Sequence, residues 1–200
     1  MDSVLSKSEH LYLPTTVTRA AKILVGGHFG AGKTTLVGSV SEIRPLRTEE
    51  PITQASVGID DLAGLPNKST TTVGLDFGRI TLTEDLVLYL FGMPGQSRFD
   101  VLREHLFVGA LGGVILVDTR RLQDSDDVLA SFEERDIPFA VVVNLWADAP
   151  QYAPEEIREA LDLADDVVLT FCDARDKKSC IRALIDFLEY LLHTRRLELS

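Results

Sequence analysis

Gly27-His28-Phe29-Gly30-Ala31-Gly32-Lys33-Thr34 is the stretch that decides how this chain folds. It follows the apolar run Ile23-Leu24-Val25 and precedes a helix-like run from Thr35 to Glu42. A glycine-rich turn that ends in Lys-Thr between a strand and a helix predicts a phosphate-binding loop. Glycine lets the backbone wrap around an anion, while N–H groups of the loop and of the helix start point at it. The sequence therefore predicts a nucleoside triphosphate ligand.

Most positions of this loop have an expected role in phosphate binding. Lys33 brings a positive charge toward the β- and γ-phosphates, and the Thr34 hydroxyl ligates Mg²⁺. Backbone N–H groups supply most of the other contacts. The expected phosphate-binding residues are Gly27, Phe29, Gly30, Ala31, Gly32, Lys33, Thr34, Thr35 and, from a later loop, Gly95.

Composition narrows the class of protein. Two hundred residues with 45% apolar content suit one globular domain with a substantial core. A net charge of −11 argues against a nucleic-acid-binding surface and against direct docking on anionic lipid. The two cysteines, Cys172 and Cys180, form neither a metal motif nor a disulfide framework, which favours a reducing cytoplasm. The sequence shows neither a signal peptide nor a membrane-length apolar run, so we expect membrane contact only through a partner.

Apolar strand-like runs alternate with helical patterns after a polar lead-in. Expected strands cover 22–25, 75–82, 86–91, 113–117, 139–145 and 167–171, and expected helices cover 33–42, 98–106, 124–134, 154–163 and 179–193. The stretch 43–70, rich in Pro and Gly, is expected to be a long loop, and Thr83-Glu84-Asp85 predicts a hairpin turn. Apolar parallel strands need helices on both faces. The prediction is therefore an α/β fold of three layers with about six strands, mostly parallel, and one antiparallel edge strand. Ligands bind at the carboxyl ends of such strands.

Two later stretches carry further candidates for this phosphate site. In Thr70-Thr71-Thr72-Val73-Gly74-Leu75-Asp76-Phe77, Thr72 is expected to offer its hydroxyl to Mg²⁺ and its N–H to the γ-phosphate. In Tyr89-Leu90-Phe91-Gly92-Met93-Pro94-Gly95-Gln96, Gly95 offers an N–H and Gln96 orients the attacking water. Each stretch taken alone is also typical of a strand start or a Pro-Gly turn.

Taken together, these motifs resemble switch I and switch II of Ras-like small GTPases. The phrases G-A-G-K-T-T, S-E-I-R-P-L-R-T-E-E, L-V-L-Y-L-F-G-M-P-G-Q and R-R-L-Q-D-S resemble the bacterial branch that includes the gliding-motility and actinobacterial conservon GTPases. This resemblance extends from about Lys22 to about Leu192. It implies a P-loop NTPase fold, Mg²⁺ and GTP or GDP as cofactors, and a GTP-binding switch. A Ras-like domain is expected over 21–195, between a flexible lead-in at 1–20 and a tail at 196–200. Roadblock-fold regulators and a membrane sensor-kinase-like protein are the partners that the resemblance implies.

The guanine-reading motifs depart from the family pattern. Small GTPases carry N-K-x-D after the fifth strand, whereas this chain has Asn144-Leu145-Trp146-Ala147-Asp148, with the Asp one residue late. Asp148 either reads the base or is a turn residue, and Trp146 either covers the base or packs on a helix. In Cys172-Asp173-Ala174-Arg175, the counterpart of S-A-K, the Ala174 N–H contacts the base. The expected guanine-binding residues are Asn144, Asp148 and Ala174.

The resemblance also implies a weak catalytic centre. Gly92 stands where switch II usually has the Asp that supports Mg²⁺, so Thr34 and Thr72 are the expected protein ligands of the metal. The Phe29 side chain is expected over the γ-phosphate, where an arginine finger would approach, and the pattern fixes no arginine in that role. The expected catalytic residues are Lys33, Thr72 and Gln96. An arginine finger contributes about 10³–10⁵ in rate, so we expect slow hydrolysis without a partner.

Two other classes of function stay open. Val114-Ile115-Leu116-Val117-Asp118 has the form of a Walker B strand, which favours a P-loop ATPase or kinase with Asp118 at the metal. The missing Asp at Gly92 and the late Asp148 favour a degenerate module that binds nucleotide without hydrolysing it.

Overall fold

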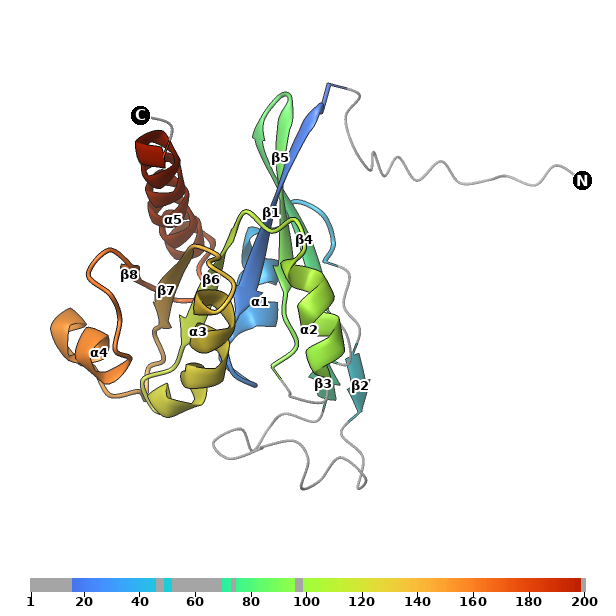
Figure 1. Ribbon diagram of the computed structural model, residues 1–200. Helices are drawn as coiled ribbons and strands as arrows, with labels where there is room; N and C mark the ends of the chain where they lie inside the picture. The colour runs from blue at the N-terminus through green and yellow to red at the C-terminus, as the bar shows by residue number, and fades with distance from the viewer. Residues whose placement is uncertain (1–15, 46–48, 52–69, 73–74, 96–98, 199–200) are drawn as a thin grey trace, which may run out of the picture.

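Six strands form one sheet, in which five strands run in the same direction and one edge strand runs in the opposite direction (Figure 1). The computed structural model describes residues 16–45, 49–51, 70–72, 75–95 and 99–198. The strands of this sheet, in spatial order, are β4 (Asp76–Thr83), β5 (Leu86–Gly92), β1 (Arg19–Gly26), β6 (Gly112–Val117), β7 (Phe139–Asn144) and β8 (Val168–Cys172). Only the edge strand β4 is antiparallel, to β5. The predicted mostly parallel sheet with one antiparallel edge strand is therefore confirmed.

Strands β4 and β5 form a hairpin with defined contacts at its open end and at its turn. Asp76 lies opposite Gly92 at the open end, where the carboxyl ends of the parallel strands also lie. At the turn, Asp85 forms an ion pair with Arg19 at 2.9 Å. Arg19, the first residue of β1, pairs in register with Leu86, the first residue of β5.

Helices α1 (Lys33–Val40) and α5 (Lys177–Glu198) cover one face of the sheet. α1 ends at Val40, because Ser41 is extended and the Glu42 carboxylate instead accepts a hydrogen bond from the backbone N–H of Thr81. The core on this face is built from both helices and alternate strand residues: Ile23, Val25, Leu36, Val37, Leu88, Leu90, Leu116, Val142, Cys180, Leu184 and Phe187.

Three helices cover the opposite face: α2 (Asp100–Phe107), α3 (Asp126–Glu133) and α4 (Pro154–Ala160). A 3₁₀ turn, η2 (Leu122–Ser125), leads into α3. The fully buried Phe132 ring of α3 lies 5.0 Å from Phe107 and 5.9 Å from Phe139, measured between ring centroids. It packs against Gly113, where a Cβ would come within 2.3 Å of the ring. The predicted cover of helices on both faces is confirmed.

The segment expected to be one long loop contains additional structure. β2 (Glu49–Pro51) pairs antiparallel with β3 (Thr70–Thr72) in a separate two-stranded sheet. The threonines were expected at the entry to the second strand of the main sheet. In the structure, Thr71 pairs with Glu50 and Thr72 with Glu49. Within the described ranges, none of the helices has the length and apolar character needed to cross a bilayer.

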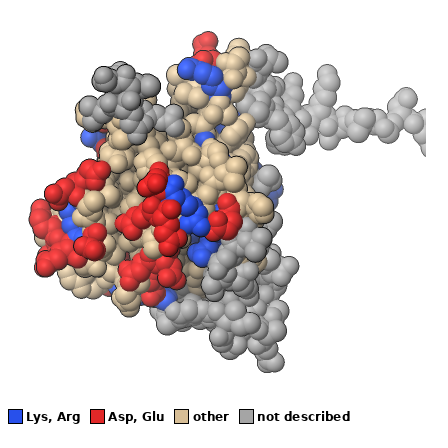
Figure 2. All heavy atoms as spheres, viewed as in Figure 1, with Lys and Arg blue, Asp and Glu red and all other residues tan. Residues whose placement is uncertain are grey.

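Acidic side chains gather over the α3 and α4 side of the molecule (Figure 2). The exposed acidic residues of these two helices and their flanks are Asp126, Asp127, Glu133, Glu134, Asp136, Glu155, Glu156, Glu159, Asp162, Asp165 and Asp166. This face carries much of the excess negative charge of the chain.

Candidate nucleotide-binding site

The phosphate loop lies where the sequence predicts it, between β1 and α1. Gly27 and Gly32 have φ angles of 134° and 109°, which residues with a Cβ rarely adopt. The Lys33 ammonium folds back into the loop and donates to the carbonyls of Gly27 and His28, both at 2.7 Å. Lys33 is thus buried at the centre of the loop, in reach of any anion bound by the loop's N–H groups.

Gly95 approaches this loop from the end of β5. A Cβ on Gly95 would lie 2.9 Å from Lys33 Nζ and 2.8 Å from the Phe29 backbone nitrogen. Gly95 therefore lies against the phosphate loop, and its contact with the γ-phosphate stays a prediction. Gln96 lies outside the described residues, and Thr72 is described only as a strand residue of β3, without its side chain.

Thr34, the expected metal ligand, contacts a carboxylate that the sequence analysis did not assign. Its hydroxyl donates to Asp76 Oδ2 at 2.6 Å. Asp76 is 2% exposed and lies opposite Gly92, where a Cβ would come within 2.9 Å of the Asp76 Cβ. Asp76 of the neighbouring strand therefore fills the space where an Asp at position 92 would lie.

A hydroxyl and a carboxylate side by side are oxygen ligands of the kind that Mg²⁺ prefers. Among the residues with described placement, no group of three or more His, Cys, Asp or Glu side chains gathers as a metal cluster. Mg²⁺ keeps several waters and phosphate oxygens in P-loop sites, so one hydroxyl with one nearby carboxylate is a sufficient protein contribution. Thr34 and Asp76 thus fit the ion that the fold implies.

His28 fixes the loop from inside. It is 8% exposed, and its Nδ1–H donates to the Phe29 carbonyl at 2.8 Å. Burial lowers the pKa of His28, and the nearby positive charges of Lys33 and Arg121 act in the same direction. The imidazole is therefore held neutral, as a donor to the loop backbone.

Asn144 joins the phosphate loop to the two loops expected to hold the base. Its Nδ2 donates to the Ala31 carbonyl at 2.9 Å, and its Oδ1 accepts from the Ala174 N–H at 3.0 Å. Both Asn144 and Ala174 are buried. Two of the expected base-binding residues are thus brought together, with the Ala174 N–H bonded to Asn144 in this structure.

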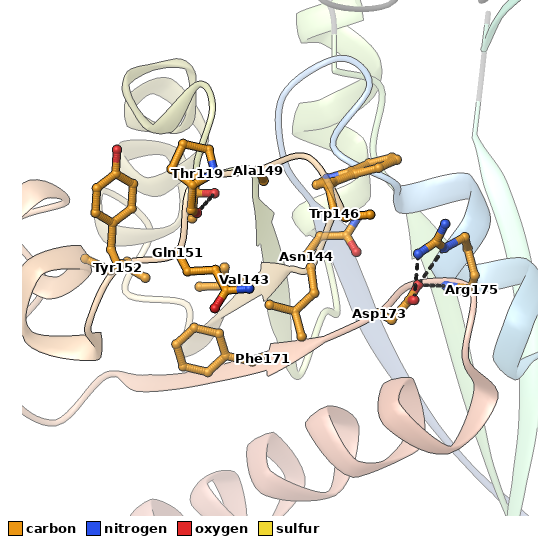
Figure 3. Close-up of a pocket in the computed structure, with 14 residues that line it drawn as sticks. Thr119, Val143, Asn144, Trp146, Ala149, Gln151, Tyr152, Phe171, Asp173 and Arg175 are labelled. Atoms are coloured by element: carbon orange, nitrogen blue, oxygen red, sulfur yellow. Dashed lines mark hydrogen bonds and ion pairs between the residues drawn. The ribbon is translucent and has the colours of Figure 1, made fainter.

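A cavity of about 390 Å³ opens at the carboxyl ends of β7 and β8 (Figure 3). Asn144, Trp146, Asp173 and Arg175 form part of its wall. Apolar side chains on the α4 side, among them Val143, Ile157 and Phe171, line it as well. Its volume falls within the range of small-molecule sites, about 300–1,000 Å³.

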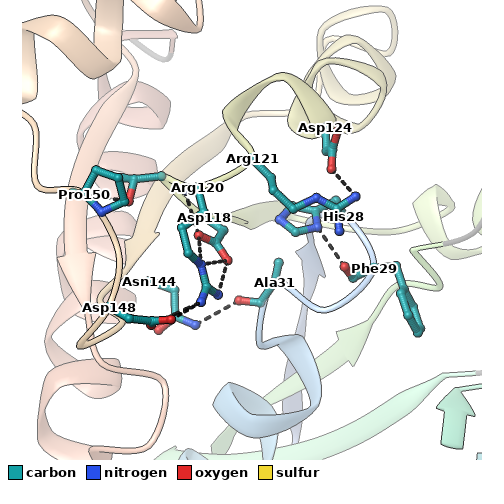
Figure 4. A network of polar contacts seen from close by, with 11 residues as sticks. His28, Phe29, Ala31, Asp118, Arg120, Arg121, Asp124, Asn144, Asp148 and Pro150 are labelled. Carbon is teal, nitrogen blue, oxygen red and sulfur yellow. Dashed lines mark hydrogen bonds and ion pairs between the residues drawn. The ribbon is translucent and has the colours of Figure 1, made fainter. Parts of the chain in front are cut away.

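Asp148, the third expected base-binding residue, is held by an arginine. Arg120 donates from one terminal nitrogen to both Asp148 oxygens at 3.2 Å, and it also bonds the buried Asp118 at 2.6 Å (Figure 4). The Arg120 guanidinium lies 4.7 Å from the centroid of the Trp146 ring. Burial opposes the ionisation of Asp118, but the hydrogen bonds from Arg120 outweigh it and lower the pKa of Asp118. Asp118 therefore serves this ion-pair network, and Asp76 is the carboxylate that meets Thr34.

The sequence analysis missed Asp76, His28, Arg120 and Asp173. The signal for Asp76 was present, because an Asp at the start of one hairpin strand falls opposite Gly92 once the hairpin is in register. Arg120 gave no such signal, since its pairing with Asp148 joins loops 28 residues apart.

Residues 25–148 match the sequence family described as a conserved hypothetical ATP binding protein. This match spans more than half of the chain, from the end of β1 through Asp148, and the chain belongs to this family. A relative is an uncharacterized protein of Methanocaldococcus jannaschii, which is 26% identical over 125 residues, covering 62% of this chain and 68% of that protein. Nucleotide binding is thus supported at the level of the family. Neither match is described as Ras-like or conservon-type, so GTP specificity and that kinship stay predictions.

Proposed function

We propose that this member of the ATP-binding family is a Mg²⁺-dependent P-loop nucleoside triphosphatase whose nucleotide is ATP. The family description supports ATP as the nucleotide. The observation that carries the proposal is the contact between Thr34 and Asp76 at 2.6 Å, next to the Lys33 ammonium inside the phosphate loop. These groups supply the cation, hydroxyl and carboxylate that metal-assisted phosphoryl transfer uses.

Each residue has a distinct part in this proposal. Lys33 exchanges its two carbonyl partners for phosphate oxygens when nucleotide binds, because charge-assisted bonds to phosphate are the stronger ones. Thr34 and Asp76 hold the metal side of the triphosphate. A Mg²⁺ ion held there would supply positive charge to the phosphoryl group that is transferred. Gly95 presents its N–H to the γ-phosphate from a position that leaves no room for a side chain.

Slow hydrolysis is part of the proposal. Phe29 is half-buried at the loop, and Figure 4 shows its ring directed away from His28, on the outer side of the loop. An aromatic ring on that side obstructs the approach of a partner's arginine. Two arginines drawn near the loop in Figure 4 are engaged, Arg120 with Asp118 and Arg121 with Asp124. Gln96 stays the predicted residue that orients water.

A second candidate is the GTP-dependent switch, favoured by the Asn144 clamp. Asn144 is the residue of the small-GTPase motif N-K-x-D that this chain retains, and it bonds both the Ala31 carbonyl and the Ala174 N–H. In this candidate, Thr72 and Gly95 sense the γ-phosphate, and the segments 43–72 and 93–100 rearrange on hydrolysis. The roadblock-fold regulator and the membrane sensor-kinase-like protein belong to this candidate as predictions.

The test is direct identification of the nucleotide. The purified protein is denatured, any released nucleotide is separated by chromatography, and single-turnover hydrolysis of MgATP and MgGTP is then measured. We expect adenine nucleotide and slow ATP turnover that the Asp76→Asn variant abolishes. Guanine nucleotide with GTP turnover would replace the first candidate by the second. Absence of binding to either would reject both.

A further inference from the structure

The cavity at the ends of β7 and β8 adjoins the phosphate loop through one shared residue. Asn144 lines the cavity and also donates to the Ala31 carbonyl of the loop. The same amide group would lie within 2.5 Å of a Cβ on Gly32, the last glycine before Lys33. A nucleotide with its phosphates in the loop thus has this cavity as the adjacent space for its base.

Asp148 does not face this cavity. Both of its carboxylate oxygens accept from Arg120, and its side chain is 76% exposed. Arg120 is itself anchored by the buried Asp118 and lies over the Trp146 ring. The cavity wall contains the neighbours Ala147 and Ala149, but not Asp148. The chain has one residue more between Asn144 and Asp148 than the motif N-K-x-D has. With this spacing, the Asp148 carboxylate lies in an exposed ion pair with Arg120 instead of in the cavity wall.

Asp173 is the acidic residue of the cavity wall. Its backbone is fixed at two points, because its N–H donates to the Ser179 hydroxyl at 3.0 Å and its carbonyl accepts from the Cys180 thiol. Arg175 donates to Oδ1 from its backbone N–H and Nε, and to Oδ2 from a terminal nitrogen at 2.8 Å. These bonds lower the pKa of Asp173, so the carboxylate is ionised.

We propose that Asp173, positioned by Arg175, is the carboxylate that meets the base edge of the bound nucleotide, and that Asp148 has no part in reading the base. This inference rests on the proposed function, since it needs a nucleotide in the phosphate loop. Figure 3 shows Asp173 and Arg175 on the same side of the cavity as Trp146 and Asn144, and Asn144 contacts the phosphate loop through the Ala31 carbonyl.

The pair offers a defined hydrogen-bonding pattern. Arg175 occupies three acceptor positions of the carboxylate, out of about four, which leaves Oδ2 able to accept one more bond. The guanidinium beside it keeps unused N–H donors on its exposed side. The Asp173 oxygen accepts and the adjacent Arg175 guanidinium donates, so the pair matches a purine edge on which a donor lies next to an acceptor. Adenine presents N6–H₂ beside N1, and guanine presents N1–H beside O6.

The experiment separates base recognition from phosphate recognition. Affinities for ADP, GDP and inorganic tripolyphosphate are measured by titration calorimetry with Mg²⁺ present, for the wild type and for Asp173→Asn, Arg175→Gln and Asp148→Asn. Tripolyphosphate uses the loop alone. We expect Asp173→Asn to lose about tenfold or more in affinity for the preferred purine nucleotide, while tripolyphosphate affinity changes less than about twofold. Asp148→Asn is expected to change neither.

Arg175→Gln keeps the test valid if Asp173→Asn disturbs the loop. Arg175 is 63% exposed in its side chain, so its replacement leaves the core intact. Arg175→Gln is expected to reduce the affinity for purine nucleotides, as Asp173→Asn does, but to a smaller extent. Purine binding that is unchanged in both variants, or lost in Asp148→Asn instead, overturns this inference while the proposed function stands. A wild type that binds neither tripolyphosphate nor purine nucleotides overturns the proposed function, and this inference falls with it.

Discussion

The two ends of the nucleotide site are built in different ways. At the proposed phosphate end, the charged side chains are buried, with Lys33 9% and Asp76 2% exposed. At the proposed base end, the charged side chains are more exposed, with Asp148 at 76%, Arg175 at 63% and Asp173 at 34%. Exposed ion pairs contribute little to stability and are screened by salt, whereas buried groups are costly to change. The fold therefore fixes the phosphate end and leaves the base end open to change.

Lys33→Ala tests the phosphate end with the largest expected effect on binding. Loss of a cation that bonds phosphate removes about 3 kcal/mol, close to a hundredfold in affinity for any nucleotide. Titration calorimetry with MgATP, MgGTP and tripolyphosphate measures it. Lys178→Ala, at an exposed lysine near the start of α5, is the matched control and should bind as the wild type does. Equal affinity of the two variants would remove Lys33 from the phosphate site.

Asn144→Ala tests the joint between the two ends. The substitution leaves the Ala31 carbonyl and the Ala174 N–H without their side-chain partner, which costs about 2–3 kcal/mol. For a chain of this size, that lowers Tm by about 4–12 °C. Scanning calorimetry on Asn144→Ala and on the control Gln151→Ala, an exposed amide in the adjacent loop, makes the comparison. A stable Asn144→Ala protein that still loses both purine and tripolyphosphate affinity would show that the clamp positions ligand groups without holding the fold.

Asp76→Asn sharpens the assignment of the metal side. An amide cannot supply the charge that Asp76 brings beside Thr34, so the Mg²⁺ concentration needed for half-maximal nucleotide binding should rise about 10–100-fold. Asp85→Asn, at the exposed turn of the same hairpin, serves as the control. Gly92→Asp should not rescue the variant, because its Cβ would come within 2.9 Å of the Cβ at position 76, which Asn retains. An unchanged Mg²⁺ requirement in Asp76→Asn would remove this residue from the metal site.

The smallest expected effect is a dependence of stability on pH through His28. Burial lowers the pKa of His28 below its ordinary value of 6.5 and outweighs the hydrogen bond to the Phe29 carbonyl, which raises it; the positive charges of Lys33 and Arg121 also lower it. The unfolded chain then binds more protons than the native state, so this contribution to stability is present above pH 6.5 and is lost as the pH falls below it. Urea unfolding of the wild type and His28→Gln across this range isolates the effect. His105→Gln, at an exposed histidine, should follow the wild type.

The two ends of the site also differ in how much of their structure could be predicted from the sequence. Local sequence patterns predict the position of the phosphate loop, the hairpin and the helices. Glycine spacing and hydrophobic periodicity involve only residues close together in the sequence. Asp76 required the hairpin register, and the capture of Asp148 by Arg120 required contact between loops distant in the sequence. The pairing of β2 with β3 escaped detection because three-residue strands carry too short a pattern. Local patterns therefore predict the position of the glycine-rich loop between β1 and α1, whereas contacts between residues distant in sequence determine the surroundings of Asp76 and Asp148.

Cys172 and Cys180 lie fully buried directly beneath the loop that carries Asp173. The neighbouring Cys180 thiol and burial raise the pKa of Cys172 well above its ordinary range, so that thiol is unreactive while it stays buried. The two buried thiols can therefore report when this part of the protein opens. The rate at which a thiol reagent labels these residues measures how often this part of the site opens, and a decrease in that rate with nucleotide would register base binding without any label attached to the ligand.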